Sequence, residues 1–238
     1  MKTILFKSTE RGSADYGWLK ANFSFSFGNY FDKNKLQFGM LRVLNDDTIA
    51  GGAGFGTHPH DNMEIITIPL EGGLKHRDSM GNEGVIRFGE IQVMSAGTGI
   101  MHSEMNASHN EQAKTLQLWV MPEMKNVIPR YDQKSFDIEN NLNRFVNVVS
   151  PHDKNDGYAL WVYQQTWFSL GIFHEERTAL YTLNNTANGV YLFLIDGEIK
   201  IGENSLSTRD AIGITDTAEI EIEILQKSKI LLIEVPMA

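Results

Sequence analysis

IITIPLEGGLKHRDSMGNEGVIRFGEIQVM, residues 65–94, alternates short runs rich in Ile and Val with turns that contain glycine. Such runs between turn signals are typical of strands, and Ser79-Met80-Gly81-Asn82 has the composition of a hairpin tip. Residues 191–214, YLFLIDGEIKIGENSLSTRDAIGI, repeat the order of strand, acidic residue with glycine, strand and polar turn. This repeat predicts two β-units of similar fold in one chain.

The rest of the chain continues the strand pattern outward from this stretch. FSFSF at 23–27 alternates strictly, which predicts a strand with its three phenylalanines on one face. MLRVL at 40–44 and TLQLWVM at 115–121 are further strand candidates, and helical periodicity is nearly absent. The polar stretch 126–145 has the character of a linker with room for one short helix. Short strands at regular spacing indicate an all-β sandwich or barrel.

Composition narrows the class of protein. The 238 residues include 21 basic and 30 acidic side chains, for a net charge of −9, and no cysteine. A net negative charge disfavours direct nucleic-acid binding, and no apolar run is long enough for a membrane helix. The absence of cysteine excludes disulfides and thiolate metal sites. We therefore expect a soluble, cytoplasmic protein that binds neither nucleic acid nor membrane.

Two short motifs point to a metal site. His58-Pro59-His60 and His102-Ser103-Glu104 each place two potential ligands at positions i and i+2. In a strand these positions share one face, so two such strands facing each other would gather three imidazoles and one carboxylate. That donor set suits a mononuclear transition-metal site with coordination positions left for a small ligand.

Other residues compete for roles at this site. Glu104 is either a ligand or an acceptor that orients a histidine N–H, and Glu64 is the rival carboxylate because it follows His60 by four residues. We expect Glu64 beside the site rather than on the ion. His76 is expected to be solvated or hydrogen-bonded near its hairpin. The remaining histidines have no partner at metal-ligand spacing, and no role is expected for His109, His152 and His174.

The spacing around these motifs resembles a known family. Residues 52–64 fit G-(x)5-H-x-H-(x)3-E, and residues 89–106 fit a second motif that has Ser95 where proline is usual and a longer loop before His102. These are similar to the two cupin motifs, in the variant found in the pirin family and, within it, in bacterial pirin-like quercetin dioxygenases. Further matches are SFSFGNYFD (24–32), LRVLNDD (41–47), RDSMGN (77–82), LQLWVMPE (116–123) and PRYDQKSFD (129–137). The resemblance covers residues 10–137 closely and the rest loosely.

This resemblance implies a bicupin, with two jelly-roll-like β-barrel domains in one chain. Residues 1–125 would form the N-terminal cupin domain with the metal site, 126–148 a crossing linker, and 149–238 a C-terminal cupin-like domain without metal ligands. The implied ligands are His58, His60, His102 and Glu104. Fe(II) is the expected ion, with Mn, Ni, Co, Cu or Zn as alternatives.

The resemblance also implies an activity. A pirin-like quercetin 2,3-dioxygenase would cleave a flavonol such as quercetin with O2 and release carbon monoxide, and Glu104 would accept the proton of the flavonol 3-hydroxyl as the catalytic residue. A small aromatic substrate and O2 are then the expected partners. The alternative is a metal-binding regulatory or redox-sensing module that docks on a protein partner without turnover. A purely structural zinc cupin is the third interpretation.

Overall fold

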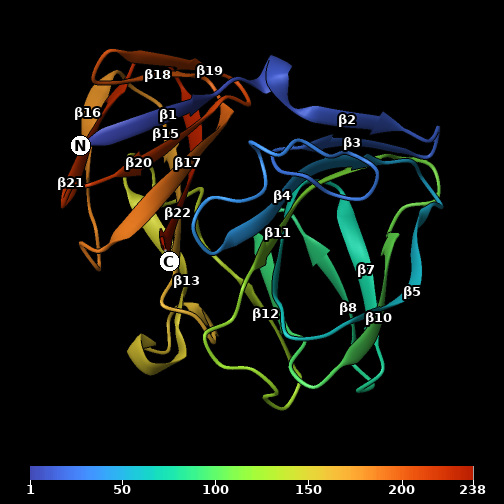
Figure 1. Ribbon diagram of the computed structural model, residues 1–238. Coiled ribbons are helices and arrows are strands. Elements are labelled where there is room, and N and C mark those ends of the chain that lie inside the picture. The colour runs from blue at the N-terminus through green and yellow to red at the C-terminus, as the bar shows by residue number, and fades with distance from the viewer. Residues whose placement is uncertain (238) are drawn as a thin grey trace.

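Two β-barrels lie side by side in the computed structural model, which describes residues 1–237 (Figure 1). Each barrel joins a seven-stranded sheet to a four-stranded sheet. The only helical elements of the described chain are two short 3-10 helices, η1 (Ser8–Glu10) and η2 (His152–Lys154). The predicted all-β fold with two barrels is confirmed. None of the helices within residues 1–237 has the length and apolar character that crossing a membrane requires.

The N-terminal barrel is drawn in blue to green in Figure 1. Its larger sheet contains, in spatial order, β12 (Arg130–Ser135), β9 (Glu90–Ser95), β6 (Glu64–Glu71), β11 (Ala113–Val120), β4 (Leu41–Ile49), β3 (Leu19–Phe23) and β2 (Gly12–Asp15). Its smaller sheet contains β5 (Gly54–His60), β10 (Ile100–Asn106), β7 (Gly73–Asp78) and β8 (Glu83–Arg87). The hairpin predicted with its tip at 79–82 is therefore β7–β8.

The C-terminal barrel repeats this arrangement except at one edge. Its larger sheet contains β1 (Lys2–Phe6), β20 (Ala211–Thr215), β17 (Asn188–Asp196), β22 (Ser228–Pro236), β15 (Trp167–Phe173), β13 (Phe145–Pro151) and β14 (Leu160–Val162). At that edge β14 pairs parallel with β13, whereas β2 pairs antiparallel with β3. Its smaller sheet contains β16 (Arg177–Thr182), β21 (Glu219–Ile224), β18 (Glu198–Ile201) and β19 (Asn204–Ser207). The repeat read from the sequence thus corresponds to β6–β9 and β17–β20. Gly72 and Gly197 turn the chain at matching points with φ of 70° and 110°, a region that glycine enters without strain.

The two barrels exchange an edge strand. β1 precedes the N-terminal barrel in the chain but pairs with β20 of the other barrel, where the blue arrow lies among the orange strands of Figure 1. β12 precedes the C-terminal barrel but pairs with β9 of the N-terminal one. The domain ranges 1–125 and 149–238 remain predictions, but strand pairing departs from them at both ends. The expected linker contains the edge strand β12 and no helix.

The larger sheets pack against each other and form the core between the barrels. Leu116 and Leu118 on β11 meet the face that carries Leu231 and Ile233 on β22, and all four are fully buried. Because side chains alternate along a strand, the other face of β11 looks into the N-terminal barrel. The predicted strand 23–27 is wrong beyond Phe23: β3 ends there, and the chain then turns Phe25 into the core between the barrels.

Candidate metal centre

The histidine motifs lie on neighbouring strands of one sheet. β5 and β10 pair antiparallel, with His58 directly opposite His102 and His60 two residues further along the same face. The two strands therefore lie side by side in one sheet. A bulge in β10 between His102 and Glu104 shifts the register locally. Adjacent strands bring the three rings together because directly opposite residues are the closest neighbours on one face of a sheet.

Three imidazoles converge on one point. The ring centroids of His58, His60 and His102 are 4.5–4.9 Å apart, and one donor nitrogen from each lies within 4.8 Å of the others. Nδ1 of His58 donates to the carbonyl oxygen of Gly56 at 2.8 Å, which leaves its Nε2 as the free lone pair. This Nε2 lies 3.1 Å from Nε2 of His102.

His76 and Asp78 support His102 from behind. Nδ1 of His76 lies 3.5 Å from Nδ1 of His102, and Nε2 of His76 lies 3.3 Å from Oδ2 of Asp78. A single set of tautomers satisfies this chain: His102 donates to His76, and His76 donates to Asp78. The His102 Nε2 lone pair then faces the cluster. His76 is fully buried, so it is hydrogen-bonded rather than solvated.

The carboxylate of Asp78 anchors that chain as an anion. Burial alone would raise its pKa, but hydrogen bonds from the side chain and backbone of Asn82, from His76 and from the backbone of Met80 outweigh burial and hold the pKa below its ordinary value. His76-x-Asp78 has the same i, i+2 spacing as the two motifs identified from the sequence. Because β7 pairs with β10 and places Asp78 opposite His102, this spacing puts His76 and Asp78 next to the metal cluster.

The rings of His60 and His102 are held in the neutral form that binds metal. Burial, reinforced by the neighbouring histidines, lowers the pKa of His102 to about 2. Burial and then His58 lower the pKa of His60 to about 4. Two unprotonated nitrogens pointing at each other across 3.1 Å have no proton to share, whereas a divalent cation between them would satisfy both. The donor set therefore fits a transition-metal ion.

Glu104 faces the same cavity but is not among the donors that lie within 4.8 Å of one another. Its carboxylate, 2% exposed, accepts hydrogen bonds from Oγ1 of Thr67 at 3.2 Å and Nε2 of Gln117 at 2.5 Å. Burial raises its pKa to about 7, against the opposing effect of these two donors. The role of Glu104 as a metal ligand stays a prediction. Thr67 and Gln117, which donate to its carboxylate, were not predicted from the sequence.

Glu64 points away from the histidines. It accepts a hydrogen bond from Oγ of Ser95 at 2.7 Å and one from a backbone N–H of Tyr163 in the other barrel. Burial raises its pKa to about 7, with these partners and Arg130 opposing the shift. The expectation that it lies beside the site is wrong, because Asn62, with φ of 44°, turns the chain between β5 and β6 and breaks the i+4 relation to His60.

An aromatic cavity of about 330 Å³ opens over the histidines. Trp119 packs edge-on against His60 at 4.9 Å and against Phe27 at 5.3 Å, so Gln117 and Trp119 are the residues of β11 that face the interior. The remaining aromatic side chains that line the cavity are Tyr16, Trp18, Phe23 and Phe55. Two buried oxygens at its base, Oδ1 of Asn45 and Oδ1 of Asp47, have no hydrogen-bond partner in residues 1–237. Burial, then Asp46 and Glu104, raises the pKa of Asp47 to about 8.

Comparison with known proteins shows the family of this chain. Residues 6–120 match the pirin family model, and residues 147–235 match the quercetinase C-terminal cupin domain. The chain is 41% identical over 232 residues to a quercetin 2,3-dioxygenase of Escherichia coli strain K12, covering 98% of each protein. The chain belongs to the pirin family. It is also 37% identical to a pirin-like protein of Caulobacter vibrioides, over 94% of this chain and 95% of that protein.

A solved pirin structure bears on the metal. The crystal structure of the bacterial pirin YhhW from Escherichia coli in complex with nickel(II) superposes with a TM-score of 0.92 at 39% identity, covering all of both chains. Together with the cluster of three histidines, this likeness supports a divalent metal ion in the N-terminal barrel of this pirin-family chain. The bicupin architecture inferred from the cupin motifs is confirmed.

Proposed function

We propose that the chain is a metal-dependent dioxygenase that cleaves a flavonol such as quercetin with O2 and releases carbon monoxide. The observation that carries the proposal is the convergence of three imidazoles at the base of a cavity walled by aromatic rings. Relatives that align over nearly the whole chain bear the name quercetin 2,3-dioxygenase. Fe(II) is the proposed ion, held by His58, His60 and His102, with Glu104 as the fourth ligand.

The side chains around the histidines have separable tasks. When bound, the ion supplies the Lewis acidity that lowers the pKa of a hydroxyl on the substrate. Glu104 accepts the proton of that hydroxyl, and Thr67 and Gln117 hold its carboxylate at the cavity wall. Trp119 and Phe27 present faces and edges to a flat ligand, which orients the ring and excludes water.

The free oxygens at the base of the cavity suit a hydroxylated ligand. Asn45 and Asp47 are each 4% exposed, and one oxygen of each lacks a donor within residues 1–237. A buried acceptor without a donor costs about 1–3 kcal/mol, and a ligand hydroxyl would remove that cost. A polyhydroxylated flavonol offers such donors on both ring systems, whereas an unsubstituted aromatic molecule offers none.

The test is metal reconstitution. The metal-free chain is loaded anaerobically with Fe(II), Mn(II), Ni(II) or Co(II) and mixed with quercetin in air, and flavonol absorbance and carbon monoxide are measured. We expect metal-dependent flavonol loss that disappears in His58→Ala and persists in His174→Ala, a control at an exposed histidine of the other barrel. Stoichiometric metal binding without flavonol loss above the uncatalysed background would instead favour the regulatory module.

Glu104→Gln separates its two proposed roles. The amide keeps the size of the side chain but neither binds metal as strongly nor accepts a proton. If Glu104 is a ligand, metal affinity falls together with turnover. If it only accepts the proton, the variant retains its metal and loses kcat, and a titration of metal binding by calorimetry distinguishes the two results.

A further inference from the structure

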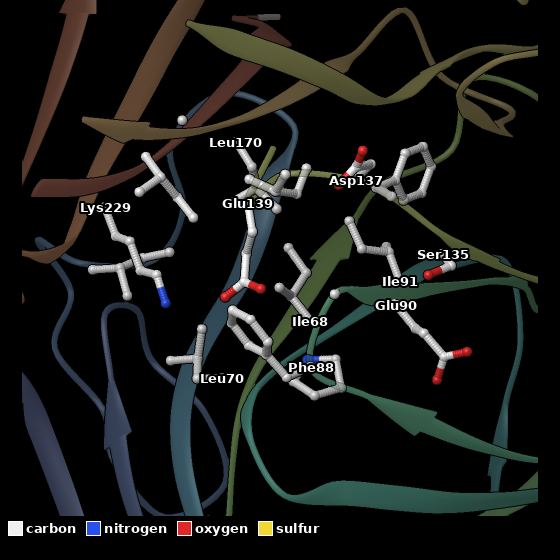
Figure 2. A pocket seen from close by; sticks show the side chains of 17 residues that line it. Ile68, Leu70, Phe88, Glu90, Ile91, Ser135, Asp137, Glu139, Leu170 and Lys229 are labelled. Carbon is white, nitrogen blue, oxygen red and sulfur yellow. The ribbon is translucent and has the colours of Figure 1, made fainter. Parts of the chain in front are cut away.

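A second cavity lies between the two barrels. This interbarrel cleft has a volume of about 380 Å³ and is built from β6, the β8–β9 turn and the segment after β12 on one side, and from β15, β17 and β22 on the other (Figure 2). It shares no lining residue with the cavity over the histidines. Both the size and the position between domains are typical of small-molecule sites.

Apolar side chains from both barrels form the walls of the cleft. Most belong to the buried core between the barrels or pack against it, so the walls are rigid. Phe88, at the β8–β9 turn, keeps 39% of its surface exposed, which is unusual for a phenylalanine beside a hydrophobic cluster. The wall residues used below are Ile68, Leu70, Phe88, Leu170, Ile172 and Ile195.

Two opposite charges point into the cleft. In Figure 2 the ammonium of Lys229 and the carboxylate of Glu139 are both directed at the space above Phe88 and Leu70. Nζ of Lys229 lies 4.4 Å from the centroid of the Phe88 ring. Within residues 1–237, no carboxylate oxygen comes within 4.0 Å of this Nζ. In the same part of the chain, the Glu139 carboxylate accepts no hydrogen bond.

The other two carboxylates at the rim are already engaged. Glu90 accepts a hydrogen bond from the backbone N–H of Arg87 at 2.7 Å, and Asp137 accepts one from Nδ2 of Asn140 at 2.8 Å. Both point away from the centre of the cleft in Figure 2. The polar surface that a ligand meets is therefore one cation and one anion above an apolar floor.

The complement of such a surface is a molecule with both charges. A ligand with only a carboxylate would meet Lys229 favourably but be repelled by Glu139, and a ligand with only an ammonium group would have the opposite conflict. We propose that the interbarrel cleft binds a free α-amino acid with a branched or aromatic apolar side chain. Its carboxylate faces Lys229, its ammonium group faces Glu139, and its side chain packs on Phe88 and Ile68.

Binding there links the two barrels. The ligand touches Ile68 and Phe88 of the N-terminal barrel and Leu170 and Lys229 of the C-terminal barrel, so it stabilises their packed arrangement. The inference does not depend on the metal or on flavonol cleavage. It can therefore be tested on the metal-free protein, and it survives if the proposed activity fails.

The experiment compares three ligands of matched shape on the full chain. L-phenylalanine carries both charges, 3-phenylpropionate lacks the ammonium group, and phenethylamine lacks the carboxylate; L-leucine tests the branched side chain. Calorimetry and thermal denaturation report binding to metal-free and metal-loaded protein. We expect L-phenylalanine or L-leucine to bind and raise Tm in both forms, and each single-charge analogue to bind at least tenfold more weakly.

Variants at the cleft locate the site. Lys229→Met and Glu139→Gln should each weaken amino-acid binding at least tenfold, whereas Lys227→Met, at an exposed lysine outside the cleft, should leave it unchanged. Circular dichroism checks that each variant is folded, and the ligand series on the unmodified chain stands without the variants. The proposal is overturned if neither amino acid binds, if 3-phenylpropionate or phenethylamine binds as tightly as L-phenylalanine, or if Lys229→Met binds normally.

Discussion

The two barrels share one order of strands but differ in what fills them. Sixteen buried apolar residues form a single cluster inside the C-terminal barrel, whereas the interior of the N-terminal barrel has separate clusters of seven and four. The difference leaves room in the N-terminal barrel for imidazoles, a carboxylate and a cavity. Where β5 and β10 place His58 opposite His102, the corresponding pair β16 and β21 places Tyr181 opposite Ile220.

Both barrels bury carboxylates, and Glu234 of the C-terminal barrel differs from Glu104 of the N-terminal barrel in its hydrogen bonds. Glu234 accepts hydrogen bonds at 2.9–3.1 Å from Tyr181, the backbone and side chain of Asn184, the backbone of Asn185 and the side chain of Asn188. Glu104 receives only two. A carboxylate with all its lone pairs occupied serves the fold, while one with free lone pairs beside a cavity is open to a proton or a metal.

Removing a ligand imidazole should produce the largest contrast. In His102→Ala we expect metal affinity to fall by at least about 100-fold, because a lost ligand costs more than a lost partner behind a ligand. Elemental analysis after dialysis measures the bound metal. Retention of a full equivalent of metal would contradict the contrast between the barrels, because the ion would then be held by residues other than the three histidines.

Emptying the C-terminal interior should instead cost stability. Ile222 is fully buried in its apolar cluster, so Ile222→Ala should lower the free energy of unfolding by about 2–5 kcal/mol. Urea denaturation of the metal-free chain gives this number. The same variant should bind metal normally, and a loss of metal affinity would show that the C-terminal barrel takes part in the site.

Replacing Glu234 or Glu104 by glutamine should lower the free energy of unfolding by different amounts. Glu234→Gln turns acceptors of five hydrogen bonds into an amide that clashes with some donors, and should lower the free energy of unfolding by about 1–3 kcal/mol. Glu104→Gln in the metal-free protein should cost less, since only Thr67 and Gln117 lose their acceptor. Chemical denaturation of both variants decides the point, and equal losses would remove the distinction between them.

Weakening the hydrogen bonds behind His102 should affect metal affinity less than removing the His102 ligand itself. Asp78→Asn leaves a residue of the same size but weakens the chain that fixes the ring of His76, so metal affinity should fall by about 10–100-fold. A competitive metal titration is the measurement. Lys75→Met, on the same strand and exposed to solvent, serves as control and should bind metal normally.

Much of the fold could be predicted because local pattern and global fold agree in it. The β7–β8 hairpin carries its own turn residues, and the repeat of β6–β9 in β17–β20 is visible in the positions of acidic residue and glycine. The i, i+2 spacing was enough to predict that His58, His60 and His102 lie close together. These features depend on neighbours in sequence, or on two strands whose faces are fixed by their own alternation.

The rest depends on contacts that no local pattern encodes. Asp78 acquires its role from the register between β7 and β10, and Glu64 is turned outward by a left-handed residue at Asn62. Phe25 leaves the face of Phe23 because β3 stops after five residues and the chain then turns into the core between the barrels. The pairing of β1 with β20 joins segments more than two hundred residues apart, which spacing along the chain does not reveal.

The pairing of β1 with β20 determines when the C-terminal barrel can form during synthesis. Lys2 pairs with Thr215, so β1 waits during synthesis for a partner made 213 residues later (215 − 2). At about 5–20 residues per second, the wait is roughly 10–40 s. Through that interval the emerging segment is an unpaired β-edge, and its lysines at positions 2 and 7 disfavour pairing with a neighbouring nascent chain. The C-terminal barrel can close only when β1 and β20 are both present.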